Sequence, residues 1–162
     1  MRAMSLFPGL LLLLCLSAKA PADEKSGVND EGFLQHWLVL APISLEENQS
    51  GEDGLAKEQL KDEAKMKPKK GDKVKVGDKE LTWKEYNAKE HQLDFNDFLG
   101  KETEDSVGYA VTYIVAPEEL KSIKMKTGSD DQCKVFLNGK EVFKYTEERS
   151  AEKDQDLSLI HI

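Results

Sequence analysis

A predicted β-hairpin near the end of the chain constrains the fold more than any other feature of the sequence. Asn138-Gly139 separates two segments with alternating apolar residues, Val135 and Leu137 before the turn and Val142 after it. Asn-Gly is the strongest short-range hairpin signal, because both central residues of a type I′ turn need positive φ. The pattern therefore predicts a pair of antiparallel strands in a β-rich domain.

Strand and turn signals precede this hairpin along most of the chain. The apolar run from Phe33 to Ile43 predicts a first buried strand that Pro42 stops. Residues 55–66 carry apolar positions among charges, which predicts one short amphipathic helix ended by Pro68. Residues 74–83 predict a small hairpin that turns at Gly77-Asp78.

The second half of the chain continues this pattern. Leu93 and Phe95 predict the start of another strand, and the segment from Val107 to Val115 predicts the longest one. Ile123 and Met125 alternate with lysines and predict a further strand. About seven short strands separated by turn signals are typical of an antiparallel β-sandwich.

The N-terminus has the pattern of a secretory signal peptide. Arg2 supplies a positive charge, Leu10 to Leu14 form the centre of an apolar run, and small residues follow at Ala18, Ala20 and Ala22. This run of roughly ten residues is shorter than the ~20 that a membrane-spanning helix needs. We expect cleavage after Ala22, a secreted or periplasmic protein, and no membrane contact after cleavage.

Cleavage would leave Cys133 as the remaining cysteine, which excludes an intrachain disulfide and disfavours a structural zinc site. Cys15 lies in the predicted leader, where bulky Leu14 precedes it and a lipidation signal needs a small residue. Removing Arg2 and Lys19 would change the formal charge from −8 to −10. An acidic chain repels nucleic acid and anionic lipid, so neither is expected as a partner.

Four segments of the sequence occur in an order known from one family of β modules. They are Trp-Leu-Val-Leu at 37–40, Leu-Thr-Trp-Lys at 81–84, Val-Gly-Tyr-Ala-Val-Thr-Tyr-Ile at 107–114, and the hairpin at 128–140. In this order they resemble the galactose-binding-like, jelly-roll modules of exported bacterial proteins. The resemblance covers residues 33–156 and implies a mostly β, antiparallel jelly-roll-type sandwich with one short helix. It also implies a module that binds carbohydrate, is stabilised by calcium, or is purely structural.

The end of the chain departs from the pattern of that family. There the hairpin is followed by a charged loop, a strand, a Gly-x-Asn turn and a final apolar strand. Here residues 157–162 follow Asp156 and look like translated sequencing adapter. We therefore expect residues 1–22 to be a signal peptide, 23–32 a flexible leader, 33–156 the module and 157–162 a non-native tail. At least two closing strands would then be missing, leaving an unpaired sheet edge; a short native tail is the alternative.

No motif in the sequence points to catalysis. It contains no Gly-x-Ser-x-Gly elbow, no His-Glu-x-x-His pair, no P-loop and no Gly-x-Gly-x-x-Gly. His36 adjoins Trp37 in a predicted strand, where a structural role is favoured, and His91 precedes another strand. With 31 acidic residues, any pair chosen for glycoside hydrolysis is arbitrary. We predict that the domain is not an enzyme.

Four residues are the candidates for ligand binding. Asp130 and Asp131 could hold Ca²⁺, the one cofactor that they would suit, although a role in the turn is favoured. Trp83, at the end of a hairpin strand, is a better candidate than Trp37 for an exposed aromatic platform, although core packing is favoured for both. Asn138, in the hairpin turn, completes the set.

These features predict a non-catalytic exported module that binds carbohydrate or supports a neighbouring domain. The first alternative is a structural or protein-interaction module without a small ligand. The second is a fragment of a larger extracellular hydrolase. An exposed concave face on which an aromatic and two or three polar groups converge would favour carbohydrate binding.

Overall fold

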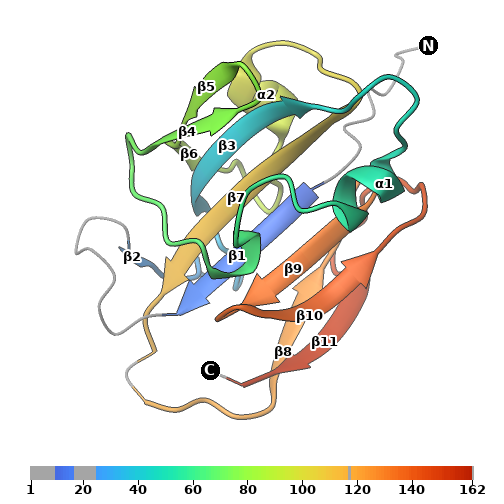
Figure 1. The fold of residues 1–162 in the computed structure, drawn as a ribbon. Helices are drawn as coiled ribbons and strands as arrows, with labels where there is room; N and C mark the ends of the chain where they lie inside the picture. The colour runs from blue at the N-terminus through green and yellow to red at the C-terminus, as the bar shows by residue number, and fades with distance from the viewer. Residues whose placement is uncertain (1–9, 17–24, 117, 162) are drawn as a thin grey trace.

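The computed structural model describes residues 10–16, 25–116 and 118–161, with the backbone alone at 10–16 and 25–26. Arg2 and the expected cleavage site at Ala22 lie outside the described residues. The fold is mostly β, with two short α-helices and antiparallel sheets (Figure 1). The single helix expected from the sequence is therefore replaced by two.

The central sheet has the strand order β10-β9-β1-β7-β3-β6. The bounds of these strands are Lys140–Tyr145, Cys133–Leu137, Leu10–Leu16, Ser106–Ile114, His36–Ser44 and Lys84–Asn87. The short β2 (Lys25–Ser26) pairs with the end of β7. All pairs in this sheet are antiparallel except those that β1 and β2 make.

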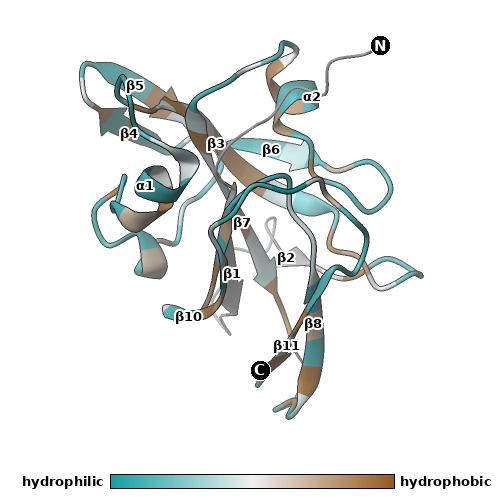
Figure 2. Cartoon of the chain, turned by 90° about the vertical axis from the view of Figure 1, so that its right-hand side faces the viewer, coloured by the Kyte–Doolittle hydropathy of each residue, from teal (hydrophilic) through white to brown (hydrophobic). Residues whose placement is uncertain are grey.

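Four shorter strands and three helical turns cover the central sheet. β4 (Lys73–Val76) pairs with β5 (Lys79–Thr82), and β8 (Ile123–Thr127) pairs with β11 (Asp156–Ile160). The helices are α1 (Gly51–Ala56), a 3₁₀ turn (Glu63–Lys65) and α2 (Phe95–Leu99). In the side view of Figure 2, α1 and β4–β5 lie on one side of the sheet, and α2 and β8–β11 lie on the other.

Both faces of the central sheet are buried, because successive side chains of a strand point to opposite faces. We call the face covered by α1 the front and the face covered by α2 the back. The front core contains Leu38, Leu40, Ile43, Leu55, Leu60, Trp83, Val107, Tyr109, Val111, Tyr113 and Phe136. The back core contains Trp37, Val39, Ala88, Phe95, Ala110, Cys133, Val135, Leu137 and Ile160. The sheet is thus the middle of three layers, and the residues that the structure describes show no closed sandwich.

Several sequence predictions are confirmed. The hairpin of β9 and β10 turns at Asn138 (φ 51°) and Gly139 (φ 83°), both with the positive φ of a type I′ turn. β4 and β5 form the hairpin predicted around Gly77-Asp78. β7 and β8 lie where long and alternating strands were expected.

Three predictions about local structure are wrong. The first strand, β3, continues past Pro42, because its pairing with β7 shifts between Leu40 and Ile43 and this irregularity accommodates proline. The predicted helix at 55–66 is instead α1, which a Ser50–Asp53 capping box starts, and a separate 3₁₀ turn.

The third concerns Leu93 and Phe95, which do not start a strand. Phe95 begins α2, where the Asp94 side chain accepts hydrogen bonds from the backbone N–H groups of Asn96 (2.8 Å) and Asp97 (3.1 Å). Gly100, with φ 67°, ends the helix. An aspartate N-cap and a glycine C-cap outweigh the alternation of two apolar residues.

The apolar run of the expected signal peptide forms β1, in the middle of the central sheet. Leu10–Leu16 pairs in parallel with β7 over seven residues and with β9 over five. β11 likewise includes residues 157–160 of the expected non-native tail, which pair with β8. No helix among the described residues is long and apolar enough to cross a membrane.

Candidate functional site

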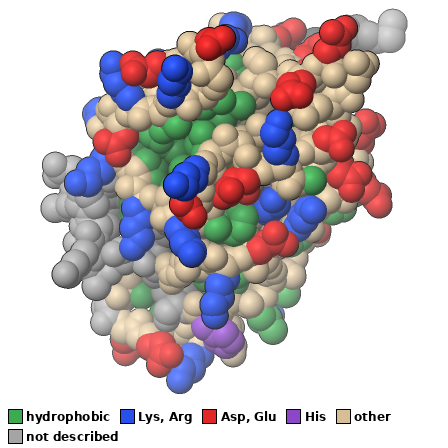
Figure 3. Space-filling model, viewed as in Figure 1, with side chains coloured by type: hydrophobic (Ala, Val, Ile, Leu, Met, Phe, Trp, Pro, Cys, Tyr) green, Lys and Arg blue, Asp and Glu red, His purple; other side chains and the backbone are tan. Residues whose placement is uncertain are grey.

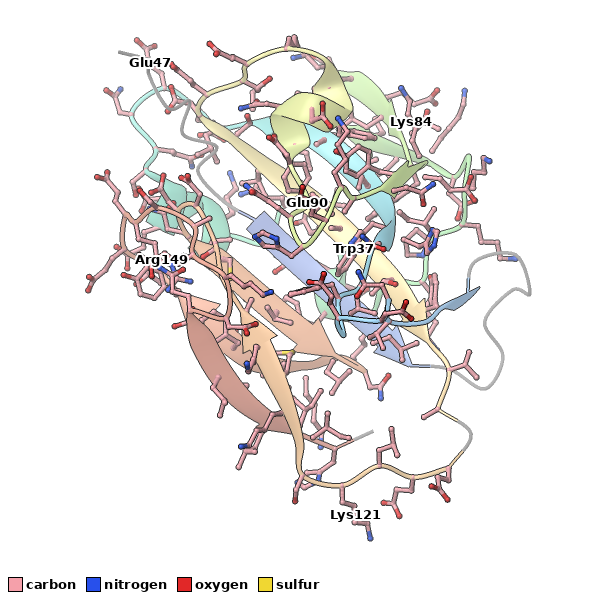
Figure 4. The ribbon with its side chains drawn as sticks, turned by 180° about the vertical axis from the view of Figure 1, so that it is seen from behind. Trp37, Glu47, Lys84, Glu90, Lys121 and Arg149 are labelled. Carbon is pink, nitrogen blue, oxygen red and sulfur yellow. The ribbon has the colours of Figure 1, made fainter. Side chains whose placement is uncertain are left out.

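A cavity of about 740 Å³ lies on the back of the molecule, between α2, β8 and the segment that connects β2 to β3. Its apolar lining includes Phe33, Trp37, Phe95 and Met125, which come from four separate segments. Figure 4 shows Trp37 on this face, near β2 and the loop that carries Glu90. Small-molecule sites in proteins typically enclose about 300–1,000 Å³, so this cavity has the size of a ligand site.

Aromatic rings gather at one side of the cavity. The ring centroids of Phe33 and His91 are 5.6 Å apart at an angle of 48°, and Lys153 Nζ lies 4.6 Å from the Phe33 centroid. Phe33 is half-buried and His91 is exposed. Trp37 is 8% exposed and its indole N–H donates to the carbonyl of Leu34 (3.1 Å), so it contributes a mostly buried apolar wall. Phe33 is therefore the ring that a ligand could reach.

Asp130 supplies a carboxylate to the same cavity. Among the described residues, its Oδ1 is one of the buried side-chain oxygens without a hydrogen-bond partner. Burial raises the pKa of Asp130, the neighbouring charges of Asp131 and Asp94 raise it further, and a hydrogen bond from the Ala151 backbone lowers it. An acceptor that has lost water without gaining a partner is energetically costly. Because this oxygen is itself buried, the carboxylate would have to turn toward the cavity before a ligand hydroxyl could satisfy it.

Asp131 holds the loop in place and does not face a ligand. It is 3% exposed, and its Oδ1 accepts a hydrogen bond from the backbone N–H of Arg149 (2.8 Å). The Arg149 guanidinium donates to Ser129 Oγ (2.7 Å), which in turn donates to the Asp131 carbonyl (2.7 Å). Asp131 thus has a structural role, but this bond is not the local turn cap favoured from the sequence, because it spans 18 residues.

Gly128 allows the loop that carries Ser129 and Asp130 to lie close to the backbone of Glu152. A Cβ on Gly128 would lie 2.0 Å from the carbonyl oxygen of Glu152, and a backbone atom cannot move aside as a side-chain end can. The close approach places Ser129 and Asp130 beside residues 151–154, which also line the cavity.

The other two predicted site residues lie elsewhere. Trp83 is 1% exposed and packs in the front core, as favoured from the sequence, so it does not supply the candidate ligand-binding platform. The physical reason is that Trp83 follows β5 on the front of the sheet, where its backbone N–H donates to the Asp72 carbonyl (2.9 Å). Asn138 is exposed in the β9–β10 turn and does not line the cavity.

Sequence reasoning therefore found one lining residue, Asp130, and missed Phe33 and His91. Phe33 was placed in a buried strand, although it precedes β3 and lies in a loop. His91 lies in the turn after β6, and only its contact with Phe33 distinguishes it from any exposed histidine. No short-range pattern in the sequence links two residues that are 58 positions apart.

The described residues contain no group of three or more His, Cys, Asp or Glu side chains placed to hold a metal ion. Asp130 and Asp131 do not converge, because Asp131 is engaged by Arg149 while Asp130 lines the cavity. Calcium needs six to eight oxygen ligands, and the geometry of this pair offers no such cage.

Compared with known proteins, the chain matches no family model, no curated protein and no solved structure. The cavity thus defines the candidate site by its own geometry, as a small-molecule-sized hollow beside a mostly β sheet.

Proposed function

We propose that the protein is a non-catalytic, exported module that binds carbohydrate in the back cavity, alone or in support of a neighbouring domain. The observation that carries the proposal is that Phe33, His91 and Asp130 line one cavity. An aromatic face beside a few polar groups is the combination that sugars need, because a sugar presents both C–H surfaces and hydroxyl groups.

The charge of the molecule supports a neutral ligand. The formal net charge is −8, and Lys and Asp or Glu side chains are interspersed on the front face, as Figure 3 shows. The cavity also carries both signs, with Asp130 and Asp154 opposed by Lys124 and Lys126. Polyanions such as nucleic acids favour a continuous basic surface, whereas a neutral glycan needs none.

The proposal includes the finer fold assignment. A jelly-roll-type sandwich related to the galactose-binding-like modules is supported by the confirmed β9–β10 hairpin and by the two-stranded β8–β11 layer against the back core. The β8–β11 ribbon would then be part of a second sheet.

The test is retention of the full chain on immobilised polysaccharides, compared among four variants. Phe33→Ala removes the reachable ring and Asp130→Asn removes the carboxylate charge at the unpartnered oxygen. The matched controls are Leu81→Ala, which truncates a half-buried apolar side chain on the front, and Glu47→Gln, which removes an exposed carboxylate. Figure 4 shows Glu47 at a distance from Trp37, at the far end of the molecule.

We expect both cavity variants to lose retention while both controls keep it, with all four folded by circular dichroism. Equal retention by all variants would place sugar binding elsewhere on the surface. A lack of retention on every polysaccharide tested would overturn the proposal in favour of a structural or protein-interaction module.

A further inference from the structure

The position of β1 defines a strand-sized space in the sheet. β7 and β9 both run parallel to β1, so they also run parallel to each other and do not pair directly. Their alignment is given by Leu10, which is level with Gly108 of β7 and with Cys133 of β9. Figure 1 shows β1 between these two strands. The sheet is continuous only while a strand occupies this space.

The two strands beside this space are poorly suited to be edges. β7 has no charged residue over its nine positions and β9 has one, Lys134, and both are buried nearly throughout. Without a strand between them, the backbone N–H and C=O groups that β1 satisfies would be unpaired on both sides. Exposed, uncharged edges of this kind recruit extended segments of other chains.

We propose that this space is a strand-accepting site that takes an extended, predominantly apolar segment of another polypeptide once residues 1–22 have been removed. The inference rests on the export part of the proposed function, because signal cleavage would detach β1. Leu10–Leu16 then acts as a placeholder during folding. The position of β1 indicates what kind of segment could replace it. β1 has seven residues without charge, and the sheet around it is buried on both faces, so the replacing segment should also be uncharged and apolar.

A second copy of the chain is a poorer occupant than a foreign segment. Each strand described between residues 25 and 161 already pairs with a neighbour inside its own molecule. A second copy that donated one of these strands would lose the pairing of that strand within its own molecule, whereas a free extended segment loses no pairing. The occupant is therefore a segment that has no strand partner before it binds.

The experiment uses the full chain with a specific protease site inserted between Ala22 and Asp23, cut after folding. A fluorescent peptide carrying residues 9–17 with Cys15→Ser, and with two lysines at each end for solubility, is then added in excess. We expect it to replace the cut leader, as followed by native mass spectrometry and fluorescence anisotropy. Amide exchange of β7 and β9 should slow again when the peptide is bound.

The matched control is the same peptide N-methylated at Leu12 and Leu13. Successive N–H groups of a strand point to opposite neighbours, so the two methyl groups block pairing with both β7 and β9 while leaving the side chains unchanged. We expect this peptide to bind roughly tenfold more weakly or worse, because each lost backbone bond leaves a buried acceptor without its donor.

Three results would overturn the proposal: equal binding of the methylated peptide, protection of β7 and β9 amides in the cut protein after the leader has left, or formation of a dimer that excludes the peptide. Equal binding of the methylated peptide would mean nonspecific apolar adhesion. Protection without the leader would mean that β7 and β9 pair directly, and a dimer would mean that a second copy is the occupant. Polysaccharide retention is measured on the same samples, so failure of the strand site and failure of glycan binding are separate outcomes.

Discussion

The two faces of the central sheet are buried in different ways. On the front, buried polar contacts connect the covering turns to the strands. Tyr109 donates to Glu63 Oε2 (2.7 Å), and Lys134 Nζ lies 3.6 Å from Glu63 Oε1. Lys134 also donates to the Leu55 carbonyl, and Tyr113 donates to the Pro68 carbonyl (2.7 Å). On the back, α2 and the β8–β11 ribbon leave a cavity of about 740 Å³ with an unpartnered carboxylate oxygen.

The contrast separates stability from function within one sheet. On the front, the bonds of Tyr109 to Glu63 and of Tyr113 to Pro68 connect residues that are 46 and 45 positions apart. Each bond forms only when the covering turn lies against the sheet. The back retains polar groups without partners, which costs stability and suits a binding site. Substitutions should therefore act mainly on unfolding at the front and mainly on ligand retention at the back.

The largest effect is expected for Trp83→Ala, at the front. Trp83 is among the largest fully buried side chains, and truncation of a buried tryptophan costs about 3–5 kcal/mol. Urea unfolding should show this loss, whereas Phe33→Ala, which truncates a half-buried ring at the back, should cost much less. Equal losses from the two variants would contradict the division between the faces.

The next effect is expected for Lys134→Met, which leaves the buried Glu63 carboxylate without its cation. Removing one partner of a buried ion pair costs about 3 kcal/mol or more, while replacing both is often close to neutral. The double variant Glu63→Gln, Lys134→Met should therefore recover much of the lost free energy of unfolding. Burial already raises the pKa of Glu63, so the deficit of the single variant should shrink at acidic pH, where Glu63 becomes neutral. A pH-independent deficit would contradict an electrostatic cause.

A smaller loss is expected for Gly108→Ala, on the back of β7. A Cβ there would lie 2.3 Å from an atom of the Phe95 ring, so α2 would have to move away from the sheet. Overpacking of this kind costs about 1–3 kcal/mol, and a second change, Phe95→Leu, should relieve it. The two changes together should unfold at higher urea than Gly108→Ala alone; additive losses would argue that Phe95 does not cause the strain.

The smallest effect on unfolding is expected for Asp130→Asn, and its sign is stabilising. The pKa of Asp130 is raised in the folded protein, so its ionisation opposes folding as the pH rises above about 3.8. Asparagine carries no such charge, and the variant should gain under about 1 kcal/mol at pH 7, because the carboxylate is only partly buried. This gain should vanish below pH 3.8.

Asp53→Asn is the matched control with the opposite sign. Hydrogen bonds from the backbone and side chain of Ser50 lower the pKa of Asp53, so its contribution to stability is present above the unfolded pKa and is lost as the pH falls. Urea unfolding at pH 3 and pH 7 should therefore separate the two aspartates. A loss of stability at pH 7 in both variants would contradict the raised pKa of Asp130.

The elements that could be predicted from the sequence are those with short-range causes. The β9–β10 hairpin follows from Asn138-Gly139, and β4–β5 follows from Gly77-Asp78, because both turns are set by the φ that their residues tolerate. The alternation of Leu93 and Phe95 predicts a strand where α2 forms, because that pattern takes no account of the caps at Asp94 and Gly100. Those caps are also short-range signals and were sufficient to find the helix.

The candidate site was less accessible to sequence analysis, because its parts are far apart in the chain. The place of Asp130 before a predicted strand indicates a site residue, whereas for Trp83 the sequence favours core packing without deciding against an exposed platform; Trp83 packs in the front core. A hairpin residue can face either side of a domain, and only the position of β4–β5 against the sheet decides which side is covered.

The sequence by itself thus determined a β-rich domain, its best turns, its acidic charge and the apolar character of Leu10–Leu16, since each depends on residue type or on neighbours within a few positions. Tertiary structure alone decided that this apolar segment lies between β7 and β9, that Trp83 is core, and that Phe33, His91 and Asp130 share a cavity. These outcomes depend on contacts between distant segments, whose free energy is set by how the layers pack and not by local preference.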